Sequence, residues 1–132
     1  MKRKILYECL EIARRNNTPE KHPQWGFYHH FSFIISDNKI LEWGTNRSSQ
    51  PLTYLGYDSY TKMHSETDAY FKAKGLMRKK QQTFEVVNIR LNKSNRIKMS
   101  NPCKCCFTFL KNMGCKKIWF TTNIDSFASL DF

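Results

Sequence analysis

The sequence predicts a three-layer α/β domain, in which a central mixed sheet of four to five strands is flanked by helices. Segments with helical spacing of apolar residues alternate along the chain with segments whose apolar residues recur at every second position. The expected order is helix, strand, strand, helix, strand, helix, strand, with a weaker fifth strand at the end. This order favours helices packed on the faces of a mixed sheet. The length of 132 residues fits one domain over 1–132.

The first third of the chain is expected to supply one helix and a hairpin. Helical spacing predicts an amphipathic helix over 2–16 that covers one face of the sheet. The residues expected on its buried stripe are Ile5, Leu6, Cys9, Leu10 and Ala13. Alternation over 27–36 predicts a strand, and Asp37-Asn38 favours a tight turn into a second strand over 39–44. The residues expected on one side of the first strand are Phe27, His29, Phe31, Phe33 and Ile35.

The middle of the chain predicts a loop, a helix and a third strand. Residues 45–63 have no regular period, and a connection of that length in a small domain is more often functional. Helical spacing over 64–77 predicts the second helix, which is expected to close at Gly75. The stretch 84–91 is rich in Val, Ile and Phe and predicts a strand, whereas 92–98 is expected to be a basic turn.

Two or three elements complete the domain. Proline suits the first position of a helix, so Pro102 is expected to open a short helix that runs to about Met113 and stops at Gly114. Residues 116–122 predict a fourth strand. The apolar pattern of the tail, 123–132, indicates a short edge strand.

Composition and charge exclude several classes of protein. The chain is 40% hydrophobic and 25% charged, and no apolar run reaches the roughly 20 residues that span a bilayer, so no membrane partner is expected. The basic N-terminus lacks the apolar core of a signal peptide, which favours the cytoplasm. The net charge of +11 points towards a polyanionic partner, with a solvated lysine-rich surface as the alternative. The oligomeric state is left open.

The cysteines point to a metal site. There are five, an odd number, and three of them lie in the run Cys103-Lys104-Cys105-Cys106. This crowding suits metal binding in a reducing compartment better than a disulfide framework. Cys9 and Cys115 are expected to be core residues.

Two motifs stand at the starts of the second and third predicted helices. The runs His64-Ser65-Glu66 and Pro102-Cys103-Lys104-Cys105-Cys106 together match the H-x-E…P-C-x-x-C pattern of zinc deaminases. A hydrolytic zinc site takes three protein ligands and keeps a fourth position for water, and one imidazole with two thiolates gives that number. The expected ligands of Zn²⁺ are therefore His64, Cys103 and Cys106.

The helical context supports this choice of ligands. Cys103 and Cys106 are three residues apart and project to one side of a helix, whereas Cys105 projects elsewhere and is expected to be a bystander. Free N–H groups and the positive dipole end in the first turn stabilise sulfur as the thiolate that binds metal.

Glu66 supplies the predicted proton chemistry. Zinc lowers the pKa of bound water from about 15.7 towards 7, and a carboxylate two residues after the histidine ligand can sit beside that water without binding the metal. Glu66 is expected to take the water proton, to protonate the ring nitrogen of a base and to deliver a proton to departing ammonia.

The same residues allow other interpretations. A lone histidine at a helix start is usually a structural residue or a cap, and paired cysteines in a core are often inert. A purely structural zinc would want a fourth ligand, which Cys105 or Cys115 could supply. Such a site would not need Glu66, so the catalytic interpretation is preferred.

These motifs make the chain resemble the cytidine/deoxycytidylate deaminase superfamily from about Phe27 to Thr122. The superfamily also contains tRNA adenosine deaminases and deaminases that act on single-stranded DNA and RNA. The resemblance implies a cytidine-deaminase-like fold, Zn²⁺ as the cofactor, and hydrolysis of a C–N bond in a cyclic amidine, most simply cytosine to uracil.

The resemblance also bears on the substrate pocket. In the family a Gly-x-Asn after the second strand places an asparagine in the pocket, and Gly44-Thr45-Asn46 stands at that point, with a plain turn asparagine as the alternative. Family members often carry His-Gly-Ala in the first strand, where this chain has His30-Phe31-Ser32. The floor of the pocket is therefore expected to differ in shape and polarity.

The expected substrate is cytosine in single-stranded nucleic acid, DNA before RNA, and the alternative is a free (deoxy)cytidine nucleotide. The net charge favours a strand, as do basic groups near the site and aromatic rings that could stack on bases. Those residues are Arg47, Lys62, Lys104, Tyr54, Tyr57, Tyr60, Trp119 and Phe120. Arg47 and Lys62 could equally bind one 5′-phosphate. A non-catalytic zinc or nucleic-acid-binding module is a more remote alternative.

The residues predicted to contact substrate are drawn from these sets. They are Asn46, Arg47, Ser65, Tyr60 and Phe120.

Overall fold

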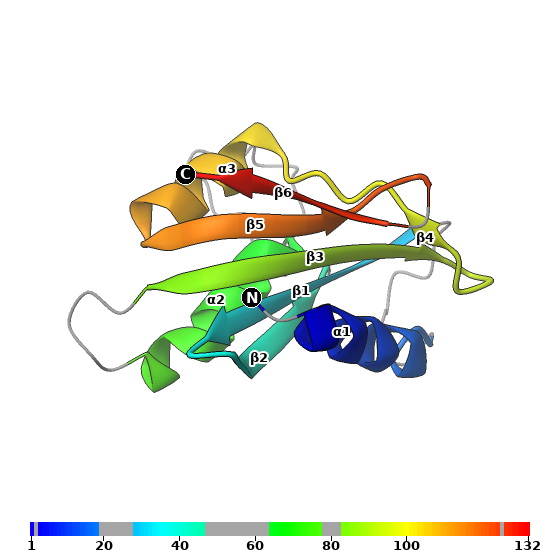
Figure 1. The fold of residues 1–132 in the computed structure, drawn as a ribbon, viewed down its shortest axis with the longest axis horizontal. Helices are drawn as coiled ribbons and strands as arrows, with labels where there is room; N and C mark the ends of the chain where they lie inside the picture. Colours follow the sequence, from blue (N-terminus) through cyan, green and yellow to red (C-terminus); the bar gives the residue numbers. More distant parts are fainter. Residues whose placement is uncertain (2, 19–27, 47–63, 78–82, 125) are drawn as a thin grey trace.

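The computed structural model is a six-stranded mixed sheet with helices on both faces (Figure 1). It describes residues 1, 3–18, 28–46, 64–77, 83–124 and 126–132. The elements are α1 (Arg3–Arg15), β1 (Tyr28–Ser36), β2 (Lys39–Thr45), α2 (Ser65–Ala73), the 3-10 turn η2 (Lys74–Leu76), β3 (Phe84–Asn92), β4 (Ile97–Lys98), α3 (Lys104–Asn112), β5 (Cys115–Thr121) and β6 (Phe127–Asp131). The predicted three-layer α/β architecture is confirmed.

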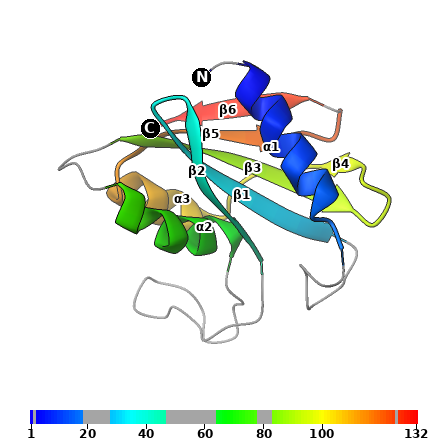
Figure 2. The same ribbon diagram turned by 90° about the horizontal axis from the view of Figure 1, so that it is seen from below.

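The strands follow the order β2-β1-β3-β5-β6, and the short β4 pairs with β3. β1 is antiparallel to both of its neighbours, and β6 is antiparallel to β5. β3 and β5 run parallel, and α3 forms the crossover that a parallel pair needs. Figure 2 shows α1 on one face of the sheet and α2 beside α3 on the other.

Alternate residues of the strands pack into two separate cores, one on each face of the sheet. Under α1 lie Phe31, Phe33 and Ile35 of β1, together with the predicted stripe of α1, which is buried throughout. On the other face, Ile34 packs with apolar residues of α2, α3 and β5. The predicted alternation of β1 is thus confirmed from His29 to Ile35, where His29 is buried as well, and Phe27 lies outside the described residues.

An aromatic cluster holds α2 and α3 together at the end away from their N-termini. The ring of Tyr70 meets the ring of Phe109 edge-on, with centroids 5.3 Å apart, and also contacts Phe71 and Phe84. Edge-to-face pairs of this kind are favourable beyond the apolar area that they bury. The cluster fixes the two helices side by side, so the residues at their N-termini are neighbours.

Several boundaries differ from the predictions. α2 stops at Ala73 and continues as η2, so Leu76 is 53% exposed and not part of the core. Pro102 precedes α3 and is not its first residue, because Cys103 takes the N-cap position. The stretch expected to be only a turn contains β4, because Ile97 is apolar and packs into the core under α1.

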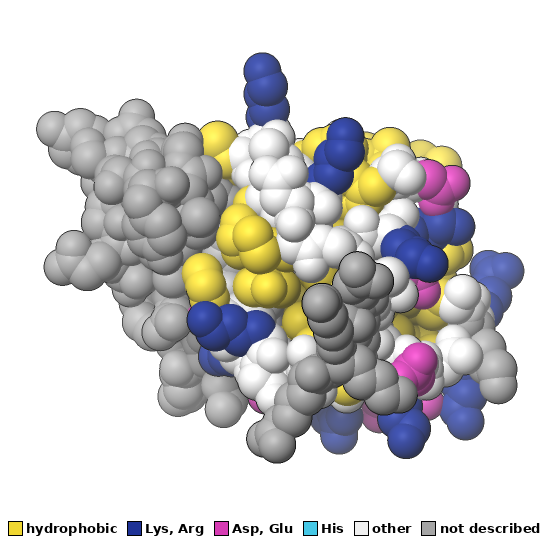
Figure 3. Space-filling view, turned by 90° about the vertical axis from the view of Figure 1, so that its left-hand side faces the viewer, with side chains coloured by type: hydrophobic (Ala, Val, Ile, Leu, Met, Phe, Trp, Pro, Cys, Tyr) yellow, Lys and Arg dark blue, Asp and Glu magenta, His cyan; other side chains and the backbone are white. Residues whose placement is uncertain are grey.

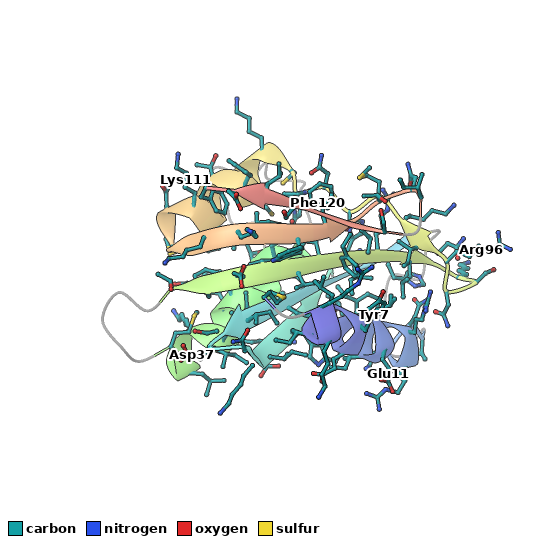
Figure 4. The ribbon with its side chains drawn as sticks, in the orientation of Figure 1. Tyr7, Glu11, Asp37, Arg96, Lys111 and Phe120 are labelled. Atoms are coloured by element: carbon teal, nitrogen blue, oxygen red, sulfur yellow. The ribbon has the colours of Figure 1, made fainter. Side chains whose placement is uncertain are left out.

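Other features agree with the sequence. Asp37 and Asn38 have positive φ angles of 52° and 58°, as the tight turn between β1 and β2 requires. That turn and the β3–β4 turn, which Arg96 marks, lie at opposite ends of the molecule (Figure 4). No disulfide joins any of the five cysteines, all of which are described, and Cys9 and Cys115 are buried as expected. Among the described helices, none has the length and apolar character to cross a membrane.

Candidate active site

Two helix N-termini bring one imidazole and two thiols together. His64 is the N-cap of α2 and Cys103 is the N-cap of α3, and Cys106 lies in the first turn of α3. The Nδ1 atom of His64 is 3.2 Å from the Sγ atom of Cys106 and 3.4 Å from that of Cys103. The ligand atoms of all three residues lie within 4.8 Å of one another. The structure therefore brings together the three residues predicted as metal ligands.

The neighbours of Cys103 at the start of α3 lower the pKa of its thiol. Its sulfur accepts the backbone N–H of Cys106 at 3.3 Å, which is the bond of an N-cap. Hydrogen bonding from the Cys106 side chain, together with that from His64 and the backbone, lowers the pKa of Cys103 to about 4. The hydrogen bond between the side chains of His64 and Cys103 raises the pKa of His64. A thiolate is the form of cysteine that binds metal.

The geometry and chemistry of this group fit zinc. Zinc–nitrogen bonds of about 2.0 Å and zinc–sulfur bonds of about 2.3 Å in a tetrahedron place N and S about 3.5 Å apart. The two N···S distances of 3.2 and 3.4 Å are close to that separation. Three protein ligands of this kind leave one position of a tetrahedron for water, as in catalytic zinc sites.

Glu66 lies beside this group but is not part of it. The cluster of candidate ligands among the described residues contains His64 and the two cysteines only. Glu66 is 6% exposed, and burial raises the pKa of its carboxyl group. A carboxyl group whose pKa is raised by burial is a better proton acceptor than an exposed one, which suits a general acid and base.

A closed ring of four hydrogen-bonding contacts surrounds the Glu66 carboxyl group. Ser65 Oγ donates to Glu66 Oε1 at 3.0 Å and lies 2.7 Å from Ser32 Oγ. Ser32 Oγ donates to Asn88 Oδ1 at 2.7 Å, and Asn88 Nδ2 donates to Glu66 Oε2 at 3.3 Å. Both oxygens of the Glu66 carboxyl group are thus held by donors, Oε1 by the Ser65 hydroxyl group and Oε2 by the Asn88 amide.

No protein-family model matches the chain, and no curated protein sequence matches it. Solved structures do match. The cytidine deaminase of Burkholderia pseudomallei is 17% identical, covers 99% of this chain and 93% of its own, and superposes with a TM-score of 0.65. The dCMP deaminase of cyanophage S-TIM5 is 15% identical over 89% of this chain and 82% of its own, with a TM-score of 0.57. The chain has the cytidine deaminase fold.

Within this deaminase fold, a tight contact between β2 and α2 positions Asn46. The Thr45 N–H donates to Asp68 Oδ2 at 3.1 Å, and Asp68 is 2% exposed. The contact requires Gly44, because a Cβ atom there would lie only 2.7 Å from Asp68 Oδ2. Asn46 follows directly, and its Oδ1 accepts the His30 N–H at 3.0 Å. The asparagine is therefore held at the end of β2, with its amide orientation set by β1.

His30 lies next to Asn46 as a neutral side chain. Burial, with the positive charge of Arg90 as a second cause, lowers the pKa of His30 to about 4. His30 and Ser32 alternate with Phe31 and therefore face α2, not α1. The Ser32 side chain is fully buried and contacts Ser65 and Asn88.

The remaining predicted contacts fall in different places. Ser65 is 2% exposed, and its hydroxyl group contacts Glu66 and Ser32. Phe120 (labelled in Figure 4) pairs with Asn88 in the β3–β5 ladder and so shares the face of the ring. Trp119 points to the opposite face, where it packs near α1, so it cannot stack on a base at this site. Five other predicted residues lie outside the described residues: Arg47, Tyr54, Tyr57, Tyr60 and Lys62.

The roles of three residues at the site were not predicted from the sequence, although Ser32 was named there as part of the altered pocket floor. Asn88 and Ser32 complete the ring around Glu66, and Asp68 anchors β2. A signal existed for Asn88, because an amide in the middle of the apolar strand Val86-Val87-Asn88-Ile89 needs a buried partner. Asp68 carried no such signal, because acidic residues are common in the first turn of any helix.

Proposed function

We propose that the protein is a zinc-dependent hydrolytic deaminase that converts cytosine to uracil. The observation that carries the proposal is the meeting of His64, Cys103 and Cys106 at two helix starts, with the buried carboxyl group of Glu66 beside them. The solved structures with this fold include cytidine and dCMP deaminases. A reducing, cytoplasmic setting belongs to the proposal, because a metal site built on Cys103 and Cys106 needs reduced sulfur.

The reaction consumes one water molecule and moves its two protons, each by way of Glu66. Zinc held by His64, Cys103 and Cys106 would lower the pKa of that water. Glu66 takes the first proton as the water oxygen bonds to the amine-bearing carbon, and gives it to the ring nitrogen of the base. Glu66 then takes the second proton from the new hydroxyl group and gives it to the amine, so that a carbonyl group forms as the C–N bond breaks and ammonia leaves. The burial of Glu66 limits the loss of these protons to bulk water.

A free cytosine nucleoside or nucleotide is the carrier that the described residues support best. Asn46 has its amide oxygen occupied by the His30 N–H, so its amide N–H groups are the ones offered to a substrate hydroxyl group. The dCMP deaminase of cyanophage S-TIM5 has been solved in complex with dCMP and dUMP, and it matches 89% of this chain.

Cytosine within single-stranded nucleic acid is the second candidate. The net charge of +11 favours it, because a polyanion binds a strongly basic domain. On the described part of the face shown in Figure 3, Lys and Arg side chains are spread over the surface. The loop tyrosines on which stacking depends lie outside the described residues.

A parallel assay separates the two candidates. The zinc-loaded protein is incubated with cytidine, deoxycytidine, CMP, dCMP, a single-stranded DNA and a single-stranded RNA that each contain cytosine, and uracil formation and ammonia are measured. Turnover of a monomer supports the first candidate. Turnover of the strands alone, with rates that fall steeply as salt rises, supports the second.

The control for this assay is Glu66→Ala, which should retain zinc and lose turnover on every substrate. Ser36→Ala serves as the matched control, because it removes a buried hydroxyl group of β1 away from the ring. Wild-type protein that binds zinc but deaminates none of the six substrates contradicts the proposal.

A further inference from the structure

The ring around Glu66 joins three separate elements of the fold. Ser65 and Glu66 belong to α2, Ser32 to β1 and Asn88 to β3. All four side chains are buried, with exposed fractions from 0% for Ser32 to 6% for Glu66. Each oxygen of the Glu66 carboxyl group has its own partner, Ser65 for Oε1 and Asn88 for Oε2. We propose that Asn88 and Ser32 are positioning residues, which fix the Glu66 carboxyl group for proton transfer.

A second layer of hydrogen bonds fixes Asn88 in turn. Its Nδ2 also reaches the Ser100 carbonyl oxygen at 3.5 Å, and Ser100 Oγ donates to the Asn88 carbonyl oxygen at 2.8 Å. Ser100 is tied to β5, because its Oγ lies 2.7 Å from Thr121 Oγ1 and accepts the Thr121 N–H at 2.8 Å. With Nδ2 engaged on two acceptors, the Asn88 amide has one orientation, and its Oδ1 must face Ser32.

The need for such a hold follows from the side chain of glutamate. A glutamate has three rotatable bonds, and a general acid and base works only within hydrogen-bond reach of the atoms that exchange protons. Two contacts on the two carboxyl oxygens fix both the position and the plane of the group. The contact on Oε2 comes directly from Asn88 of β3, and the contact on Oε1 comes from Ser65 of α2, whose hydroxyl group Ser32 of β1 contacts in turn. Because β1 and β3 are paired from Tyr28–Asn92 to Ile35–Glu85, the sheet fixes Asn88 and Ser32 relative to each other.

The inference rests on the proposed deaminase function, and kinetics on that reaction test it. Asn88→Asp keeps the shape of the side chain and the acceptor for Ser32 but removes the donor to Glu66. Ser32→Ala removes the hydroxyl group that links Asn88 to Ser65. Ser36→Ala, which removes a buried hydroxyl group farther along β1, is the matched control.

Both ring variants should keep one zinc per chain and a wild-type KM, while kcat falls about 10- to 100-fold, the usual loss on removing a supporting contact. Ser36→Ala should keep a wild-type kcat. A merely structural role would lower the fraction of active protein and zinc content together, without a selective loss of kcat per zinc-loaded chain. Wild-type kcat in both zinc-loaded ring variants overturns the proposal.

A stability experiment tests the contact without reference to activity. Asn88→Asp places two carboxyl groups against each other, whereas adding Glu66→Gln restores an amide donor to the pair in the reverse direction. The double variant should therefore unfold at a higher urea concentration than Asn88→Asp alone. If the two substitutions shift the urea midpoint additively, the side chains at positions 66 and 88 do not interact, and the ring is refuted. If the wild type deaminates no substrate, the proposed function fails, and this cycle still decides whether the ring holds Glu66.

Discussion

His30 makes a specific prediction about stability and pH. Burial lowers its pKa from 6.5 to about 4 in the folded chain, whereas the unfolded chain has the ordinary value. Between these two values the unfolded state binds a proton that the folded state does not. The free energy of unfolding is therefore highest above pH 6.5 and falls as the pH is lowered towards 4. A gap of about 2.5 pH units corresponds to about 3 kcal/mol.

The assay is urea unfolding of the wild type and His30→Asn at pH 7.5 and pH 4.5, followed by tryptophan fluorescence. The wild type should lose about 2–3 kcal/mol more than the variant between the two pH values, because only the wild type carries the buried imidazole. Other groups and metal release act on both proteins alike. Ser36→Ala, a β1 variant without a titrating group, should lose as much as the wild type. Equal losses in the wild type and His30→Asn would refute the assignment.

Three further predictions follow from close contacts and buried groups. Gly44→Ala should lower the free energy of unfolding by about 2 kcal/mol or more, because its Cβ atom would lie 2.9 Å from a carbonyl carbon of α2; Gly75→Ala, with open space around it, should be neutral in the same urea titration. Iodoacetamide should label Cys103 in the native, zinc-free protein and spare Cys115, whose pKa burial raises to about 12; zinc should block the Cys103 reaction, and peptide mass spectrometry reads the outcome. Glu66→Gln should bind zinc yet lose turnover, because an amide keeps the shape of the side chain but cannot take up the proton of water; turnover at the wild-type rate would contradict the role of Glu66.

Apolar periodicity predicted most of the fold correctly. The spacing of apolar residues alone predicts the buried stripe of α1 and the two faces of β1, because each side chain there packs against one neighbouring layer. The helical spacing of apolar residues gave a wrong prediction at the end of α2. Leu76 continues the helical pattern of α2, but the helix tightens into η2 after Ala73 and leaves Leu76 at the surface.

The site was predictable where its chemistry dictates residue types at fixed spacing. His64, Cys103 and Cys106 could be found because each stands at a helix start, and the structure places their ligand atoms within 4.8 Å. Asn88 and Ser32 could not be assigned to Glu66, because their contacts span 22 and 33 residues of sequence and depend on strand register. A one-residue slip of β3 would turn Asn88 to the α1 face and break the ring.

The start of α2 shows how this fold reconciles a polar site with a closed core. Ser65, Glu66, Thr67 and Asp68 are four consecutive polar residues, and each is at most 6% exposed. Burying a polar group is unfavourable unless it is hydrogen-bonded, and each of these side chains has a partner. Ser65 and Glu66 belong to the ring, and Thr67 donates to the His64 carbonyl oxygen. Asp68 accepts the Thr45 N–H of β2 and pairs with Lys72. The first turn of α2 therefore docks on the sheet through polar contacts, while the turns that follow dock through Ala69, Ala73 and Tyr70. Apolar packing fixes which face of a helix meets the sheet, whereas hydrogen bonds fix the positions of individual atoms. The later turns of α2 therefore supply stability, and its first turn sets the position of Glu66.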